Sequence, residues 1–321
     1  MNILEVEGLT KKYDNFTAVK KIDFTVAEGE IFGFLGPNGA GKTTTINMLC
    51  GLASITGGTA RLDGLDYRRS LPAIKSQIGI VPDESNLYEE LDGFDNLNFC
   101  ASLYGLGKQE RGERAARLLK LFGLTDAGGK RYKHYSKGMK RKLTIAAALI
   151  HEPRMLFLDE PTTGIDVASA RQIRQMIQEL NDAGTTVFLT THYIEEAERL
   201  CHRIAFIVGG EIVRCGSLKE LMKTMQQGTE IQFTLSGGET GPGKDFKEHF
   251  PDYSVDESKK GEVRIRAAGE ISLYPLVNYF EERGRRVYEA RVIRPSLEDV
   301  FVRITGLDLE KMKQEKGGRR G

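Results

Sequence analysis

The first feature that could do chemistry is the glycine-rich segment at residues 36–43. It fits the pattern GxxxxGK[ST], in which backbone N–H groups of a loop and of the following helix surround phosphate oxygens. Lys42 is expected to reach the β and γ phosphates of a nucleotide, and the Thr43 hydroxyl is expected to bind Mg²⁺. A strand precedes and a helix follows, which argues against a chance glycine-rich turn. The predicted phosphate-binding residues are Gly36, Pro37, Asn38, Gly39, Ala40, Gly41, Lys42 and Thr43.

Two adjacent carboxylates form the second candidate feature. Asp159 and Glu160 follow the apolar run 155–158, which predicts a buried strand with both acids at its carboxyl end, where ligands bind in open α/β sheets. We expect Asp159 to hold Mg²⁺ through water and Glu160 to polarise the attacking water. The alternative, that both acids simply end a strand at the surface, is disfavoured by the phosphate loop upstream.

The elements that must position these residues alternate between strands and helices over the first two thirds of the chain. This alternation predicts an α/β fold with a mainly parallel sheet covered on both faces, preceded by an N-terminal β subdomain at 3–26. A helix at 42–49 follows the phosphate loop, and mostly helical patterns predict a helical insertion at about 84–134, with helices near 96–104 and 109–122. The predicted strands of the sheet are 30–35, 78–81, 155–159, 187–190 and 203–208.

The alternation breaks near residues 225–228, so we place the end of a nucleotide-binding domain, 1–226, there. Residues 227–308 predict a small C-terminal α+β domain, whose last helix should turn Leu297, Val300, Phe301 and Ile304 towards the small core. The basic tail at 309–321 is expected to be disordered. The expected elements of the small domain are strands 231–235, 262–266 and 287–292 and helices 273–283 and 297–305.

Charge and hydropathy exclude some classes of protein. The chain has 46 basic and 45 acidic residues among 321, so no charge excess indicates a nucleic-acid partner. Its longest apolar runs are far shorter than the roughly 20 residues that span a bilayer, and no charged-then-apolar leader opens the sequence. We therefore expect a cytoplasmic protein that binds no nucleic acid.

Residues 134–140 extend the pattern to a known family. Their sequence, His-Tyr-Ser-Lys-Gly-Met-Lys, resembles the LSGGQ signature of the ATP-binding-cassette (ABC) transporter family, which has a P-loop NTPase fold. Ser136 and Gly138 match that signature, whereas Tyr135, Lys137 and Met139 depart from it. In the family this segment opens a helix and contacts the γ-phosphate of ATP held by the opposite subunit. The resemblance covers essentially the whole chain.

Further motifs occur in the family's order. Residues 163–166 resemble the D-loop, and His192 after Thr191 resembles the switch histidine that hydrogen-bonds the γ-phosphate. Catalysis is therefore assigned to Glu160, His192 and Lys42. Tyr13 matches the aromatic residue that stacks on adenine, and Thr44 joins the nucleotide-binding set.

Asp83 is a departure from the family. It stands where the family has the glutamine of its Q-loop, which touches Mg²⁺ and nucleotide. A carboxylate there is expected to favour the metal but to repel the γ-phosphate, which predicts weak ATPase activity without a partner. By this resemblance the metal residues are Thr43, Asp83 and Asp159.

The segment 294–306 resembles the ending of ATPases from bacterial exporters whose permeases are separate polypeptides. The resemblance implies an ATPase that uses ATP and Mg²⁺, pairs with a second ABC cassette as a homodimer or heterodimer, and drives an integral membrane permease. Its expected place is the inner face of the cell membrane, as a peripheral subunit. Three alternatives stay open: a weakly hydrolysing regulatory cassette, a soluble non-transport ABC ATPase, and an importer subunit.

Overall fold

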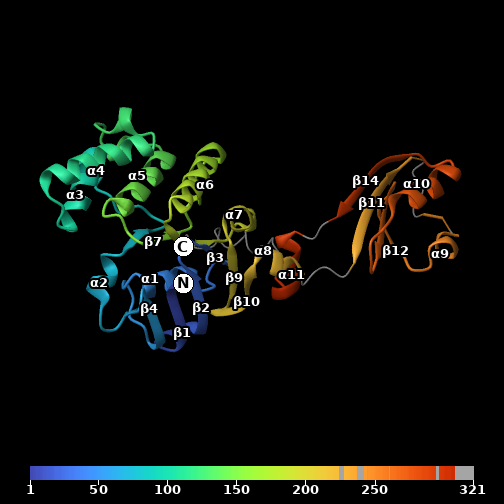
Figure 1. Ribbon diagram of the computed structural model, residues 1–321, viewed down its shortest axis with the longest axis horizontal. Helices are drawn as coiled ribbons and strands as arrows, with labels where there is room; N and C mark the ends of the chain where they lie inside the picture. The colour runs from blue at the N-terminus through green and yellow to red at the C-terminus, as the bar shows by residue number, and fades with distance from the viewer. Residues whose placement is uncertain (224–227, 237–241, 244, 260, 294–295, 308–321) are drawn as a thin grey trace, which may run out of the picture. The chain divides into compact units, whose positions relative to one another are not determined.

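The computed structural model describes residues 1–223, 228–236, 242–243, 245–259, 261–293 and 296–307 (Figure 1). Within these ranges, no helix combines the length and the apolar character needed to cross a membrane. The chain divides into two compact units, a larger one of Met1–Leu218 with the segment that begins at Phe301, and a smaller one of Lys219–Val300. The division falls at Leu218, whereas the sequence placed it near residue 226. The tail predicted to be disordered lies outside the described residues.

A six-stranded sheet in the order β10-β9-β3-β8-β7-β6 forms the centre of the larger unit. Its strands are β3 (Ile31–Leu35), β6 (Ile78–Val81), β7 (Met155–Asp159), β8 (Thr186–Thr191), β9 (Arg203–Val208) and β10 (Glu211–Ser217). The five predicted strands pair in parallel, which confirms the predicted fold class. Strand β10 was not predicted. It pairs antiparallel with β9 at the edge of the sheet, and its largely exposed side chains give little hydrophobic pattern.

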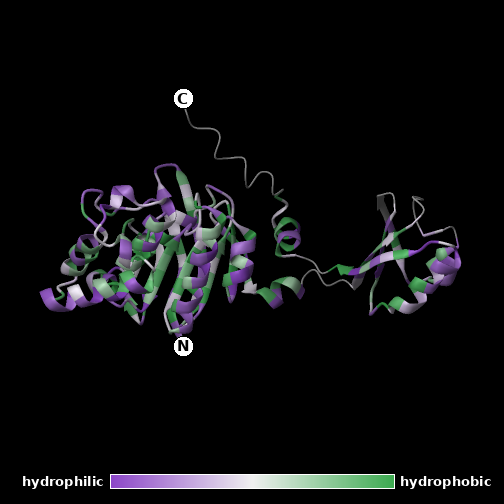
Figure 2. Cartoon of the chain, turned by 90° about the horizontal axis from the view of Figure 1, so that it is seen from above, coloured by the Kyte–Doolittle hydropathy of each residue, from purple (hydrophilic) through white to green (hydrophobic). Residues whose placement is uncertain are grey.

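The core of this unit contains a cluster of phenylalanines. Strands β3 and β7 are buried along their whole length, as expected for parallel strands covered on both faces. The ring centroids of Phe24, Phe34 and Phe157 lie 5.3–5.8 Å from that of Phe188. Truncating one such ring to alanine typically costs about 3–5 kcal/mol. Figure 2 shows the hydrophobic colouring concentrated in these inner strands. Pairing between β3, β8 and β7 sets their carboxyl ends side by side.

A second, antiparallel sheet in the order β2-β1-β4-β5 forms the N-terminal β subdomain. It consists of β1 (Asn2–Tyr13), β2 (Phe16–Ala27), β4 (Gly57–Leu62) and β5 (Leu65–Asp66). Strands β1 and β2 form a hairpin whose last pair is Tyr13 and Phe16. The hairpin therefore sets two aromatic side chains next to each other at its tip.

Helices complete the larger unit. Three of them, α3 (Gly93–Leu103), α4 (Lys108–Leu121) and α5 (Lys137–Leu149), contact one another and form a group at one end of the unit (Figure 1). The first two lie in the predicted helical insertion, and α5 follows it. The remaining helices are α1 (Lys42–Leu49), α2 (Leu71–Lys75), α6 (Val167–Asp182), α7 (Ile194–Leu200) and α8 (Leu218–Lys223), the last of which begins at the boundary between the units.

The smaller unit contains a four-stranded antiparallel sheet in the order β12-β13-β11-β14. The strands are β11 (Thr229–Leu235), β12 (Ser254–Lys259), β13 (Glu262–Ala267) and β14 (Val287–Ile293), and the helices are α9 (Phe246–His249) and α10 (Leu273–Glu282). Alternate residues of β11 and β13, including Phe233 and Ile265, share one core with Phe280 of α10. This unit is the predicted α+β region, with β12 and α9 added.

The last helix, α11 (Leu297–Thr305), corrects one expectation. Phe301 is fully buried, and its ring lies edge-on against Phe206 of β9, with centroids 5.2 Å apart. The prediction that Phe301 faces the core of the small domain is therefore wrong. An amphipathic pattern predicts that a helix buries one face, but it does not identify the surface that covers it.

Candidate nucleotide site

The phosphate loop joins β3 to α1. Gly41 precedes the helix with φ of 100°, a conformation that residues with a Cβ rarely adopt. A Cβ there would also lie 2.7 Å from the carbonyl oxygen of Ala18, so the loop requires glycine at this point. No side chain caps the start of α1. Its first N–H groups are therefore directed at whatever anion lies in the loop.

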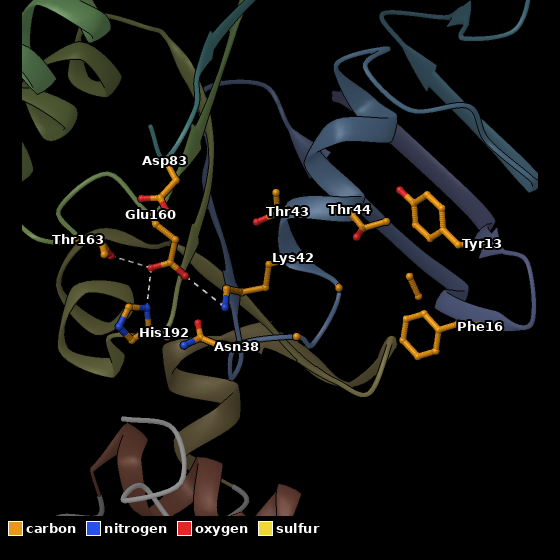
Figure 3. Close-up of a pocket in the computed structure, with 13 residues that line it drawn as sticks. Tyr13, Phe16, Asn38, Lys42, Thr43, Thr44, Asp83, Glu160, Thr163 and His192 are labelled. Atoms are coloured by element: carbon orange, nitrogen blue, oxygen red, sulfur yellow. Dashed lines mark hydrogen bonds and ion pairs between the residues drawn. The ribbon is translucent and has the colours of Figure 1, made fainter. Parts of the chain in front are cut away.

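Lys42, the first residue of α1, is 5% exposed. Its ammonium donates to the carbonyl oxygens of Gly36 at 2.8 Å and Pro37 at 3.1 Å. The same nitrogen lies 3.2 Å from Oε1 of Glu160, as Figure 3 shows. The loop lysine and the second carboxylate after β7 thus form a buried ion pair.

Glu160 follows β7 with a positive φ of 49°, a conformation that costs of order 1–3 kcal/mol in a residue other than glycine. Its backbone N–H donates to the carbonyl oxygen of Thr190 on the neighbouring strand β8 at 3.1 Å. Its Oε2 atom accepts hydrogen bonds from Nδ1 of His192 at 2.6 Å and from Oγ1 of Thr163 at 2.9 Å. The carboxylate is held in one orientation by contacts from three sides.

The charge of Glu160 follows from these contacts. Burial raises the pKa of the Glu160 carboxyl, but the hydrogen bond from His192 and the positive charge of Lys42 outweigh it and hold the pKa at about 2. The group is therefore ionised at neutral pH and can only accept hydrogen bonds. It follows that Nδ1 of His192 carries a proton, which leaves Nε2 as the ring nitrogen for a further partner.

Asp159, at the end of β7, is 3% exposed. Its Oδ1 atom accepts a hydrogen bond from Oγ1 of Thr190 at 2.5 Å. Among the described residues, no group of three or more His, Cys, Asp or Glu side chains is arranged to hold a metal ion. Mg²⁺ does not need such a group, because it is usually held by one or two carboxylates together with phosphate oxygens and water. The Asp159 carboxylate is a ligand of that kind.

These residues surround a cavity of about 320 Å³. Figure 3 shows the aromatic side chains Tyr13 and Phe16 at one end and Glu160 and His192 at the other. Ten predicted site residues line it: Tyr13, Asn38, Gly39, Gly41, Lys42, Thr43, Thr44, Asp83, Glu160 and His192. Three lining residues were not among the predicted site residues, namely Phe16, Ala18 and Thr163, although Thr163 begins the segment that resembles the D-loop. Phe16 could have been found from the pairing of the β1-β2 hairpin, but not from residue type alone.

Tyr13 lies at the tip of that hairpin and is 46% exposed. The ammonium group of Lys11 lies 4.8 Å from the centre of its ring, close enough for a cation–π contact. Lys11 is itself held by the carbonyl oxygen and the hydroxyl of Ser54, at 2.8 and 3.0 Å. The Tyr13 ring is thus supported by its own strand and half open to solvent, an arrangement that suits stacking on a planar base.

Ser136 and Gly138 do not line this cavity. Ser136 is the N-cap of α5, where its side chain accepts a hydrogen bond from the backbone N–H of Met139 at 3.2 Å. A Cβ on Gly138 would lie 2.5 Å from Oγ of Ser169 on α6, so the close packing of α5 on α6 requires glycine. Within one chain, the start of α5 belongs to a different surface from the phosphate loop.

Asp83, just beyond β6, lines the cavity with a side chain that is 52% exposed. Its Oδ1 atom lies 3.8 Å from a guanidinium nitrogen of Arg141 on α5. A positive charge therefore lies next to the carboxylate that replaces the family's glutamine. Arg141 itself does not line the cavity, and its contact with Asp83 was not expected from the sequence.

Comparisons with known proteins agree with this geometry. A family model described as ABC transporter matches residues 19–163. The daunorubicin/doxorubicin resistance ATP-binding protein DrrA of Streptomyces peucetius is 43% identical over 317 residues, which is 94% of this chain and 92% of that protein. The linearmycin resistance ATP-binding protein LnrL of Bacillus subtilis (strain 168) is 38% identical over 310 residues, which is 96% of this chain and 99% of that protein.

Solved structures give the same result. The structure of an ATP binding subunit of an ABC transporter has a TM-score of 0.64 and 30% identity, covering 70% of this chain and 93% of that one. A dimeric bacterial ABC transporter cassette has a TM-score of 0.62 and 28% identity, covering 67% of this chain and 98% of that one.

Proposed function

This chain belongs to the ABC transporter family as an ATP-binding subunit, and we propose that it hydrolyses Mg-ATP at a site completed by a second cassette, so as to drive a separate export permease. The observation that carries the proposal is the placement of Glu160 between Lys42 and His192, above the phosphate loop. This arrangement combines a phosphate-binding cation, a buried carboxylate and an imidazole in one cavity.

Phosphate binding falls to the loop and to Lys42. No side chain caps the backbone N–H groups at the start of α1, so they can donate to the phosphate oxygens. The three N–H groups of Lys42 contact Gly36, Pro37 and Glu160. Phosphate oxygens therefore compete with a carboxylate and two carbonyl groups for the same cation. The base stacks on Tyr13 at the opposite end of the cavity.

Hydrolysis needs a water molecule aligned with the bond between the γ-phosphorus and the bridging oxygen. Glu160 accepts a hydrogen bond from that water and orients it, while Nδ1 of His192 holds the carboxylate in place and Nε2 lies at the end of the cavity where the γ-phosphate would bind. The water oxygen bonds to phosphorus while the bond from phosphorus to the bridging oxygen breaks, and ADP leaves with that oxygen. One proton of the water stays as the hydroxyl of inorganic phosphate, and the other passes to solvent. A carboxylate whose pKa is held at about 2 by His192 and Lys42 acts mainly through orientation and charge.

Thr43, Asp83 and Asp159 are the residues that would hold Mg²⁺, which neutralises charge on the phosphate oxygens. Thr43 and Asp83 line the cavity. The hydrogen bond from Thr190 holds the buried carboxylate of Asp159 in one orientation.

A second cassette supplies the groups that one chain does not direct at its own nucleotide. Ser136 and Gly138 begin α5 outside the cavity, so the hydroxyl and the helix N-terminus are available to ATP held by a partner. Likeness to a dimeric cassette supports this arrangement. Several relatives are named as resistance or export proteins. We infer from these names that this chain is a peripheral subunit at the cytoplasmic face of the membrane, bound to an integral membrane permease.

The test is the size in solution of a Glu160→Gln variant, measured by light scattering with and without Mg-ATP. This change keeps the side-chain shape but blocks hydrolysis, so an ATP-dependent shift from monomer to dimer is expected. Glu152→Gln, which changes an exposed glutamate in the turn after α5, is the matched control and should hydrolyse ATP without accumulating as a dimer. A Glu160→Gln protein that binds ATP and stays monomeric would contradict the homodimer and favour a different cassette as partner.

A further inference from the structure

The segment 82–89, between β6 and α3, makes hydrogen bonds and an ion pair with side chains of α5. The Ser85 hydroxyl lies 2.8 Å from Oγ1 of Thr144 and accepts a hydrogen bond from the hydroxyl of Tyr132 at 2.5 Å. The ammonium of Lys140, whose side chain is half-buried, lies 3.4 Å from Oε1 of Glu89. Helix α5 and this segment thus share polar contacts at several places along their length.

Arg141, in the second turn of α5, makes further contacts with this segment and is 8% exposed. Its Nη1 donates to the carbonyl oxygen of Pro82 and its Nη2 to that of Asp83, each at 2.5 Å. The Asp83 carboxylate adds a charge contact at 3.8 Å. Two parallel donors at fixed separation are a property of the guanidinium group, which lysine cannot reproduce.

The two ends of this connection lie at different sites. Asp83 lines the nucleotide cavity of its own chain. Arg141 lies on the helix whose first residues, Ser136 and Gly138, do not line that cavity. A displacement of Asp83 towards metal and phosphate would act on α5 through the Arg141 fork. Because a helix transmits such a displacement along its axis as a rigid body, the start of α5 would respond.

We propose that Arg141 is a positioning residue that couples the two ATP sites of the dimer, by linking Asp83 in one site to the helix that completes the other. The inference rests on the proposed function, since it requires the start of α5 to contact the partner's ATP. A single chain can bind ATP without the link between Asp83 and α5. Two chains need that link to associate around two ATP molecules. Loss of the link should therefore affect dimerisation and leave the first binding step unchanged.

The experiment uses the full chain carrying Glu160→Gln, with and without Arg141→Met. Binding of a fluorescent ATP analogue to dilute protein gives the affinity of the monomer, and light scattering gives the ATP concentration at which half the protein is dimeric. We expect Arg141→Met to raise that concentration about tenfold without changing the affinity of the monomer. Arg117→Met, which removes an exposed arginine of α4 paired with Glu152, is the matched control and should change neither quantity.

Each outcome decides between the two proposals. If the parent Glu160→Gln protein does not dimerise with Mg-ATP, the proposed function fails, and the coupling fails with it. If the parent dimerises and Arg141→Met dimerises at the same ATP concentration, the coupling alone is overturned. Should Arg141→Met not fold, Arg141→Lys keeps the charge but lacks the fork, and a shift smaller than tenfold in the same direction is expected. An Arg141→Lys protein that dimerises like the parent overturns the coupling as well.

Discussion

Lys42 and Glu160 form an ion pair at 3.2 Å in which both side chains are less than a tenth exposed. The two residues come from elements far apart in the sequence, the start of α1 and the end of β7. Their contact means that the phosphate-binding cation also neutralises the carboxylate that orients water. Engagement of Lys42 by phosphate would weaken that neutralisation and raise the pKa of Glu160 above about 2, which makes the carboxylate a better hydrogen-bond acceptor for water.

The stability of the nucleotide-free protein should depend on this pair. Lys42→Met removes the cation that pairs with the buried carboxylate of Glu160. Because this leaves a buried negative charge less well compensated, we expect the free energy of unfolding to fall by about 3 kcal/mol. Adding Glu160→Gln removes the unpaired charge and should recover most of the loss. Urea unfolding of the two single variants and the double variant measures this coupling, and strictly additive effects would contradict it.

His192 should contribute to turnover more than to binding. His192→Ala removes the group that orients Glu160 and contacts the γ-phosphate, and we expect the rate of phosphate release at saturating ATP to fall about 100-fold or more. The KM for ATP should change little, because the loop and Lys42 still bind the phosphates. Tyr193→Phe, which alters the neighbouring ring without removing it, is the control. A large rise in KM with unchanged turnover would show that the histidine serves binding instead.

Asp83 should restrain hydrolysis in the absence of a permease. Asp83→Gln removes one negative charge near the phosphate groups, and we expect the basal ATPase rate to rise about fivefold, the equivalent of roughly 1 kcal/mol. The Mg²⁺ concentration needed for half-maximal activity should rise too, because a carboxylate ligand is lost. Steady-state phosphate release over a Mg²⁺ titration measures both. If rate and Mg²⁺ dependence are both unchanged, the expectation for Asp83 is wrong.

Gly138 should be required for packing as well as for any contact with ATP. In Gly138→Ala the added Cβ would lie 2.5 Å from Oγ and 2.7 Å from Cβ of Ser169, and overpacking of this kind costs about 1–3 kcal/mol. The second change Ser169→Gly removes both atoms and should restore the thermal midpoint. If Gly138→Ala unfolds at the same temperature as the parent, α5 and α6 can separate locally without cost.

The smaller unit should lose stability in acid through Asp245. Hydrogen bonds from Arg283 and then Tyr279 hold the pKa of Asp245 at about 2, below its ordinary value of 3.8. A folded-state pKa that is lowered stabilises the fold above pH 4, and this contribution disappears as the pH falls from about 4 to about 2. Near-ultraviolet circular dichroism of the tyrosines follows the change. Asp245→Asn should remove this dependence, whereas Asp252→Asn, at an exposed aspartate, should retain it.

The sequence predicts those parts of the site whose signal is local. The phosphate loop and helix α1, whose bounds Lys42–Leu49 agree with the prediction, depend on residue type and on the change from an apolar strand to a helix. The aromatic pair Tyr13 and Phe16 depends on hairpin register, and the fork from Arg141 to the Asp83 segment depends on tertiary contact. A single sequence carries no direct signal for the Arg141 contact, because its two partners are 58 residues apart along the chain.

The burial of Phe301 against Phe206 has a further consequence. Residues 219–300 leave the larger unit and the chain then returns to it, so the smaller unit is an insertion anchored at both ends. A single proteolytic nick within it would produce two fragments on a denaturing gel that still migrate together under native conditions. Release of the insertion would require a second cut, and until then the nicked protein would keep the mass of the intact chain plus one water molecule.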